Sequence, residues 1–321
     1  MGDPMKAGVR AASQSGMSRC LIPILFLLLA TPAWAQLPKP GAPEKRGIDG
    51  IPTKTWAELT DKYVSRLGES ALSVNRPAWQ HAETPNFIYH FRSAVAATET
   101  SVESEFYYRV IAADLKKDSS SWQRKAHIFI FESEAEWAEF QKVGGLDPWT
   151  GGLNAGNELF LLRDAKMRWK GRVLGHEITH LVVNRFFPAG VPLWLHEGYA
   201  ENVSRKAYSA YYRARGYISK PGGAIVPKAS FIPLERLMNL RSYPENPLEV
   251  KTFYEQSDAL VRFLVSKDHD KFLKFFGMVA NGATNDAALA ATYFGDFTTV
   301  AKLDEAFRKD TENDGVLARK W

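Results

Sequence analysis

Cysteine is almost absent from this sequence. Cys20 is the only one among 321 residues, and it precedes an apolar run near the N-terminus rather than following it. That position does not fit a lipid-acylated cysteine. If the N-terminal segment is removed, the remaining chain has no thiol, which excludes disulfides, cysteine metal ligands and a cysteine nucleophile. Such a chain is compatible with an oxidising compartment.

The main apolar run, Leu21 to Ala30, is too short to span a bilayer. Basic residues precede it, and Ala33-Trp34-Ala35 supplies small residues at the two positions that signal peptidase reads. We therefore predict a signal peptide at 1–35, cleaved after Ala35. The mature protein is expected to be secreted or periplasmic, with no stable membrane anchor. The long leader leaves the true start open between Met1, Met5 and Met17.

The charge of the chain is mildly positive, and its lysines and arginines are scattered. The net charge is +5, and it falls to +3 without residues 1–35, which carry three basic and one acidic side chain. A nucleic-acid binder normally shows a clustered basic stripe, and no such cluster is present, so nucleic acid is not an expected partner. The composition, 45% hydrophobic and 12% aromatic, is that of a globular protein with a substantial core.

Proline and glycine mark residues 36–55 as a linker, with Pro38, Pro40, Pro43 and Pro52. We expect one domain at 56–321, with an α/β front lobe (56–187) and a helical lobe (188–321). Hydrophobic periodicity predicts the elements of the front lobe. They are helices at 56–67 (closed by Gly68), 101–116 and from a Ser133/Glu136 capping box to 144–145, and strands at 86–91, 126–131 and 158–162.

Three further features of the chain carry expectations. Residues 207–247 have no clear periodicity, and Pro221-Gly222-Gly223 interrupts them, so the segment is either a binding loop or a covering loop. From Thr252 onward, aromatic and aliphatic stripes predict helices. His81, His90 and His127 are expected to be structural, because no two of them have the spacing of metal ligands.

The most informative motif is HEITH, residues 176–180. Two histidines four apart on a helix lie about 40° apart around its axis, so His176 and His180 can reach one metal ion. Neutral imidazole suits Zn²⁺, and Glu177 is placed to accept a proton from bound water. The alternative is an ordinary surface helix with two solvated histidines.

A second segment, Trp194-Leu195-His196-Glu197-Gly198, supports the metal interpretation. Pro188, Gly190 and Pro192 allow the chain to reverse before it. Glu197 is then placed to be the third ligand. Glu201, one turn further on, can accept a hydrogen bond from a ligand histidine, unless it is only a surface carboxylate. His196 competes as a ligand but points about 100° away from Glu197.

HEITH followed by WLHEGYAE resembles the gluzincin metallopeptidases, and most closely the peptidase-MA-like domains of bacterial secreted proteins. The resemblance to the zinc aminopeptidases of that group is more distant. The resemblance to the gluzincins implies a zincin-like fold, metal ligands His176, His180 and Glu197, and a catalytic Glu177. It covers roughly residues 86–309.

The same resemblance extends to Phe253-Tyr254-Glu255-Gln256, which is similar to a helix start in the zinc aminopeptidases. There a tyrosine stabilises the oxyanion, a role that maps onto Tyr254; the alternative is a core tyrosine with a solvated hydroxyl. One departure matters. The segment from Gly152 to Glu158 lacks the order of the strand that binds a free amino terminus, so aminopeptidase activity is not supported. The segment remains a candidate edge strand for an extended peptide.

Together these patterns predict an α+β, zincin-like protein with a mixed-sheet N-terminal lobe, an HExxH spine helix and a helical C-terminal lobe. The expected activity is hydrolysis of peptide bonds in a peptide or protein substrate, with one Zn²⁺ per chain and Glu177 as general base. Two alternatives are a zinc hydrolase of cell-wall peptides and a zinc-stabilised binding protein without turnover. Substrate, endo- or exo-cleavage and oligomeric state stay open.

Overall fold

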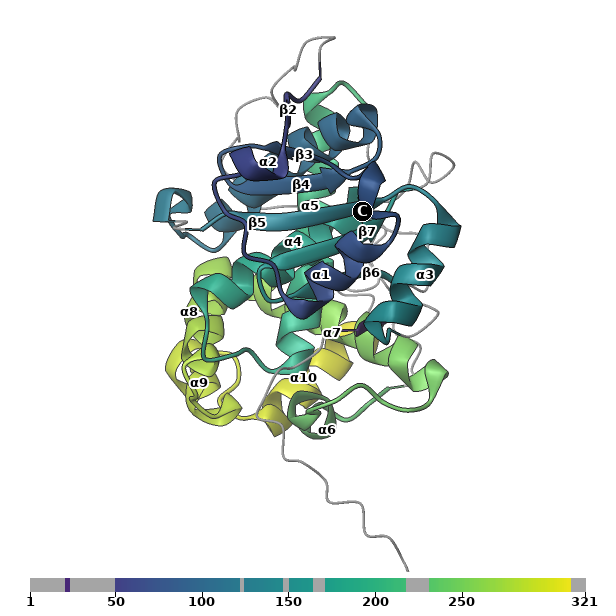
Figure 1. The fold of residues 1–321 in the computed structure, drawn as a ribbon. Coiled ribbons are helices and arrows are strands. Elements are labelled where there is room, and N and C mark those ends of the chain that lie inside the picture. Colours follow the sequence, from purple (N-terminus) through teal and green to yellow (C-terminus); the bar gives the residue numbers. More distant parts are fainter. Residues whose placement is uncertain are drawn as a thin grey trace, which may run out of the picture.

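A computed structural model describes residues 21–23, 50–121, 124–146, 150–163, 171–217 and 231–312. Its architecture is a mixed β-sheet with helices on both faces, followed along the chain by a group of helices (Figure 1). This confirms the expected α+β class. In the described part of the chain, no helix is both long and apolar enough to cross a membrane.

The described strands form a single seven-stranded sheet in the order β1-β6-β7-β5-β4-β3-β2. The central strands β4, β5 and β7 are parallel, and the outer pairs are antiparallel. Helix α2 (Ala94–Asp114) provides the crossover that joins β4 to β5. The strands are β1 (Leu21–Pro23), β2 (Thr53–Lys54), β3 (Gln80–Glu83), β4 (Phe87–Phe91), β5 (Ala126–Phe131), β6 (Thr150–Ala155) and β7 (Glu158–Leu162).

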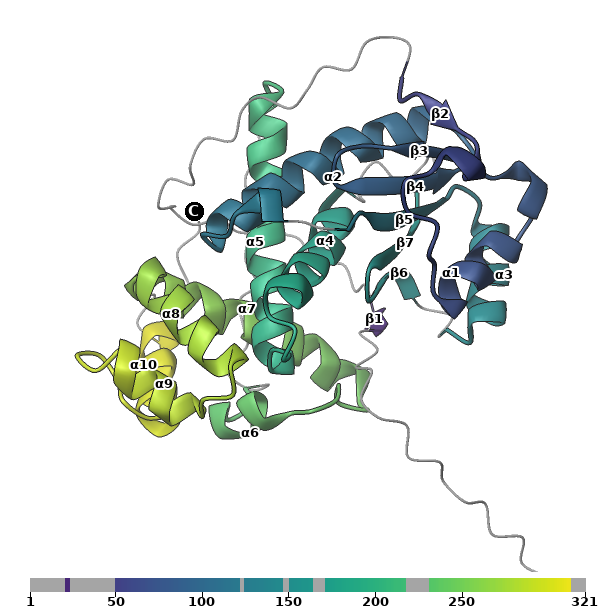
Figure 2. The ribbon, with the colours of Figure 1, turned by 60° about the vertical axis from the view of Figure 1, so that its left-hand side comes forward.

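Each face of the sheet is covered by its own helices (Figure 2). Successive side chains of a strand point to opposite faces. On β5, Ile128 and Ile130 therefore enter the large core beneath α2, while Phe129 and Phe131 enter a smaller core beneath α1 (Arg66–Ser73) and α3 (Glu134–Gly144). Burial on both faces explains the unbroken apolar composition of the central strands.

Two long helices connect the sheet to the helical part of the chain. Helices α4 (Gly171–Phe186) and α5 (Leu193–Ala214) contribute buried side chains to the large core. The remaining helices follow α5 in sequence and lie together in Figure 1. They are α6 (Leu234–Asn239), α7 (Pro247–Lys267), α8 (His269–Ala280), α9 (Asn285–Thr292) and α10 (Val300–Glu312).

The predicted helix at 56–67 is wrong. Within that range only a 3-10 turn at Trp56–Glu58 and the first two residues of α1, which begins at residue 66, are helical. Ser65 caps α1 by accepting from the backbone amides of Leu67 and Gly68. Gly68 does not stop the helix; it lies inside it, where a Cβ would come within 2.9 Å of a carboxylate oxygen of Glu158.

Other boundaries also differ from the expected ones. Helix α2 begins at Ala94 rather than at residue 101, because Ser93 caps it. Helix α3 does start after Ser133, but that side chain makes no capping hydrogen bond. Helix α5 continues to Ala214, so part of the predicted irregular stretch is helical. Pro221-Gly222-Gly223 lies outside the described residues.

Three residues of the predicted signal peptide are described. They form β1, which pairs antiparallel with β6 at one edge of the sheet, with Leu21 opposite Leu153 and Pro23 opposite Thr150. The rest of that segment, and the predicted linker up to residue 49, lie outside the described residues. The signal peptide therefore stays a prediction.

The three front-lobe histidines form a hydrogen-bonded chain on the sheet face beneath α1 and α3. His81 Nδ1 lies 2.8 Å from His90 Nδ1, and His90 Nε2 lies 2.9 Å from His127 Nδ1. All three are buried, and burial is the main cause that lowers the pKa of each. Burial lowers the pKa of His127 from 6.5 to about 4; the charge of Asp61 opposes this shift and that of Arg124 adds to it.

This chain of histidines predicts a loss of stability in acid. As the pH falls, these histidines bind protons in the unfolded state before they do so in the folded state. Their contribution to the free energy of unfolding is therefore complete above the ordinary histidine pKa of 6.5 and is lost as the pH drops toward about 4. His127 alone contributes ~3 kcal/mol to that loss. Unfolding in urea between pH 8 and pH 4 should show a shallower pH dependence for His127→Gln than for the wild type. Equal slopes would contradict the prediction.

Candidate metal centre

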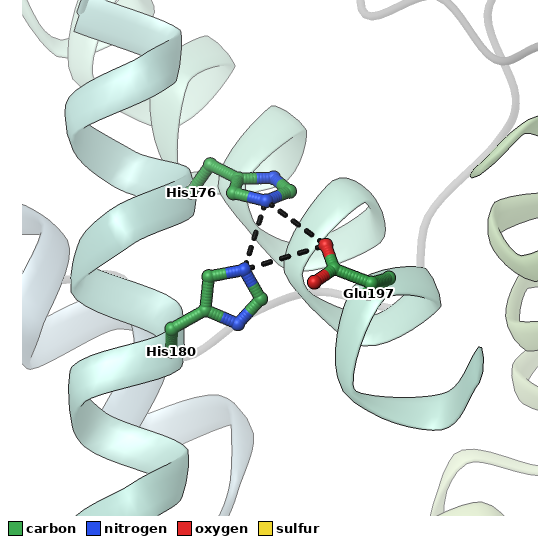
Figure 3. Close-up of side chains that lie close together, drawn as sticks. All are labelled: His176, His180 and Glu197. Carbon is green, nitrogen blue, oxygen red and sulfur yellow. Dashed lines mark hydrogen bonds and ion pairs between the residues drawn. The ribbon is translucent and has the colours of Figure 1, made fainter. Parts of the chain in front are cut away.

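Helices α4 and α5 bring the two sequence motifs together. Helix α4 ends at Phe186, and the chain reverses through residues 187–192, where Gly190 has φ +100°, a conformation that favours glycine. Helix α5 then begins directly after Pro192. His176 and His180 project from α4 toward Glu197 of α5 (Figure 3).

Three donor atoms meet between these helices. His176 Nε2 lies 2.9 Å from His180 Nε2, and Glu197 Oε2 lies 3.3 Å from the first and 3.4 Å from the second. All three side chains are buried. The donors of a tetrahedral zinc site, with metal–ligand bonds of about 2.0–2.1 Å, lie about 3.3–3.4 Å apart. The two distances to Glu197 match this range, and the 2.9 Å between the imidazole nitrogens is about 0.4 Å shorter, so the group could hold one small divalent ion.

Hydrogen bonds on the far side of each imidazole support the same conclusion. His176 Nδ1 lies 3.3 Å from Glu201 Oε1, and His180 Nδ1 lies 3.3 Å from His196 Nε2. If each Nδ1 donates its proton outward, both Nε2 atoms present lone pairs to each other and to the carboxylate of Glu197. Three converging lone pairs repel one another, and a cation between them removes that repulsion.

The local electrostatics also favour positive charge. Burial by itself lowers the pKa of His176, but hydrogen bonds and charges from Glu197 and Glu201 outweigh it and raise the pKa to about 10. Arg172 pairs with Glu201 on the outer side of the site. Glu201 thus links His176, a candidate metal ligand, to a charged side chain of α4, and this contact orients the His176 ring.

His196 is adjacent to the metal group but does not belong to it. Its ring centroid lies 4.3 Å from that of His180, on the side of His180 opposite the facing Nε2 atoms. The sequence could place it only as a competing ligand. In the structure it is instead a hydrogen-bond partner that fixes which nitrogen of His180 faces the donors.

Glu177 is fully buried between the metal group and the sheet. Burial, reinforced by the charge of Glu197 and opposed by that of His176, raises the pKa of its carboxyl to about 8. Its carboxylate lies against β6, where a Cβ added at Gly152 would be 3.4 Å from Oε1, and neither carboxylate oxygen accepts a hydrogen bond within the described part of the chain. The carboxylate of Glu177 therefore lies beside the backbone of β6, the strand next to the edge of the sheet.

Tyr254, on α7, stacks on a second tyrosine that contacts the site. Its ring centroid lies 5.8 Å from that of Tyr243, with 16° between the ring planes. The Tyr243 hydroxyl donates to Glu197 Oε1 at 2.6 Å. Tyr243 was missed by the sequence analysis, because it lies in the loop before α7 and belongs to neither motif.

The comparisons with known proteins agree with this geometry. The family model described as Peptidase MA superfamily matches residues 113–310, more than half of the chain. The chain therefore belongs to the Peptidase MA superfamily, which confirms the resemblance noted in the sequence. A comparison with curated proteins found no match.

The packing of α5 against α7 sets the position of Glu197. At Gly198 an added Cβ would lie 2.4 Å from the backbone oxygen of Ser257 on α7, so only glycine fits without a shift. We expect Gly198→Ala to lower the free energy of unfolding by about 1–3 kcal/mol. Denaturation in urea measures this.

A matched control is Gly277→Ala in α8, where an added Cβ meets no described atom within 4 Å. That substitution is expected to raise the free energy of unfolding by about 0.5–1 kcal/mol, because alanine favours a helix interior over glycine. If Gly198→Ala is as stable as Gly277→Ala, the close contact between α5 and α7 is not real.

Proposed function

We propose that the protein is a zinc-dependent peptidase that hydrolyses peptide bonds with Glu177 as general base. The observation that carries the proposal is the convergence of His176, His180 and Glu197 at zinc-like spacing, with the buried Glu177 next to His176 in the chain. A site that only stabilises a fold has no use for such a carboxylate. A zinc-stabilised binding protein without turnover is therefore the weaker alternative.

The chemistry divides between the ion and the side chains. Zinc in such a site acidifies water and polarises the scissile carbonyl. Glu177 takes a proton from the attacking water as its oxygen bonds to the carbonyl carbon. When the carbon–nitrogen bond breaks, Glu177 returns the proton to the leaving amine.

The substrate that fits this site is an extended peptide. Strand β6 runs past Glu177, and a peptide that pairs with its outer edge is held by main-chain hydrogen bonds close to the metal group. That edge accepts an antiparallel strand, since Leu21–Pro23 of the same chain pairs there. Cleavage of the predicted signal peptide after Ala35 would remove β1 and leave the edge open.

Tyr254 is the proposed donor to the oxyanion that develops on the scissile carbonyl. Its ring stacks on Tyr243, which in turn contacts the ligand Glu197, so it lies at the border of the site. A phenol in that position stabilises charge that appears only in the transition state. Secretion or export to the periplasm completes the proposal, with a peptide or protein substrate and no nucleic acid.

A cleavage screen tests the proposed function. The mature chain is incubated with casein, a mixed peptide library and cell-wall peptides, with and without a zinc chelator. We expect internal or terminal cleavage of at least one set, abolished by the chelator and restored by added zinc. Cleavage of cell-wall peptides alone would favour the alternative that the protein is a zinc hydrolase of cell-wall peptides. A zinc-loaded protein that cleaves nothing would favour the binding protein.

A further inference from the structure

The two carboxylate oxygens of Glu197 have different partners. Oε2 faces His176 Nε2 and His180 Nε2 at 3.3 and 3.4 Å. Oε1 accepts the hydroxyl proton of Tyr243 at 2.6 Å. The two oxygens thus differ: Oε2 faces the two imidazole nitrogens, and Oε1 is held by the Tyr243 hydroxyl.

Tyr243 is fixed in turn by aromatic neighbours. It lies between α6 and α7, and its ring stacks on Tyr254 and meets the edge of Phe253 at a centroid distance of 5.9 Å and an angle of 87°. Offset and edge-to-face contacts of this kind orient a ring. The direction of the Tyr243 hydroxyl is therefore set by α7, whereas the carboxylate that it contacts belongs to α5.

The contact has a chemical consequence for the ligand. A carboxylate free at both oxygens can bind a metal through either oxygen or both. A short hydrogen bond to Oε1 occupies that oxygen and leaves Oε2 for the ion. One coordination position that a bidentate Glu197 would fill then remains available for water.

We propose that Tyr243 is a positioning residue for the metal: it holds Glu197 in a one-oxygen binding mode and keeps a coordination position open. The inference rests on the proposed metal site and adds a residue that neither motif contains. The two stacked tyrosines, Tyr243 and Tyr254, then have different roles. Tyr243 acts on a metal ligand, while Tyr254 is the proposed donor to the reacting carbonyl.

The test compares Tyr243→Phe with Tyr254→Phe. Both substitutions remove one hydroxyl and keep the stacked rings. Tyr243→Phe also removes the hydrogen bond to the buried Glu197 Oε1, so zinc binding is measured at a temperature where circular dichroism shows both metal-free variants folded. We expect Tyr243→Phe to weaken zinc binding by about 10–100-fold in competition with a chromophoric chelator. Tyr254→Phe should keep wild-type zinc affinity and lose turnover at saturating substrate.

A second readout does not depend on activity. In the Co²⁺-loaded proteins, the visible absorption of Tyr243→Phe should weaken relative to the wild type, because a two-oxygen Glu197 raises the coordination number. This readout is taken on the folded protein, so it still tests the proposal if the variant proves less stable. Wild-type affinity together with a wild-type spectrum in Tyr243→Phe would overturn the inference. Failure of the wild-type chain to bind zinc would instead overturn the proposed function.

Discussion

Glu177→Gln is expected to bind zinc like the wild type and to lose peptide hydrolysis by about 10²–10⁴-fold. Glutamine has nearly the same shape as glutamate but cannot take the proton of the attacking water. The ligand atoms of His176, His180 and Glu197 are untouched by the change. Turnover of the best substrate from the cleavage screen and zinc content of the same sample measure the two effects together.

The matched control is Glu139→Gln, which makes the same change of charge on the exposed side of α3. It should leave both zinc content and turnover unchanged. Undiminished hydrolysis by Glu177→Gln would show that another group serves as the base. Loss of zinc in that variant would show instead that Glu177 itself belongs to the ligand set.

His180→Ala should abolish stoichiometric zinc binding. It removes one of three protein donors, and the remaining two cannot complete a site in which His176 and Glu197 share one ion. An ion that binds only the folded state stabilises it, by about 2.7 kcal/mol at a free concentration one hundred times its dissociation constant. Added zinc should therefore raise the unfolding temperature of the wild type and not that of His180→Ala.

His269→Ala serves as the control for His180→Ala. His269 lies 3.4 Å from Asp114, in a polar cluster with Tyr199 and Lys206, and no described contact joins it to the metal group. The variant should retain zinc and the stabilisation that zinc gives. If His180→Ala also retains one ion per chain after dialysis, the assigned ligand set is wrong.

The central strands were predictable because burial on both faces leaves an unmistakable apolar run. The predicted strand at 126–131 coincides with β5, and that at 158–162 with β7. Helix starts were less predictable, since a start depends on contacts that are distant in sequence. Ser65 caps α1 and also donates its hydroxyl to Glu158 at 2.6 Å, a partner 93 residues away.

The grouping of His176, His180 and Glu197 was predictable for a different reason. Helical spacing alone places His176 and His180 on one face of α4. The two prolines around Gly190 indicate the chain reversal that brings Glu197 of α5 close to these histidines. The tertiary contacts of the site carry no such local signal. Tyr243 reaches Glu197 across 46 residues, from a loop that the sequence marked only as irregular.

X-ray absorption at the zinc edge of the purified mature chain tests the central claim most directly. The account predicts one zinc per chain, four nitrogen or oxygen neighbours at about 2.0–2.1 Å and the outer-shell signal of two imidazoles. His180→Ala should lose that signal together with the metal. A chain without stoichiometric metal, or a zinc shell that contains no imidazole, would contradict the account.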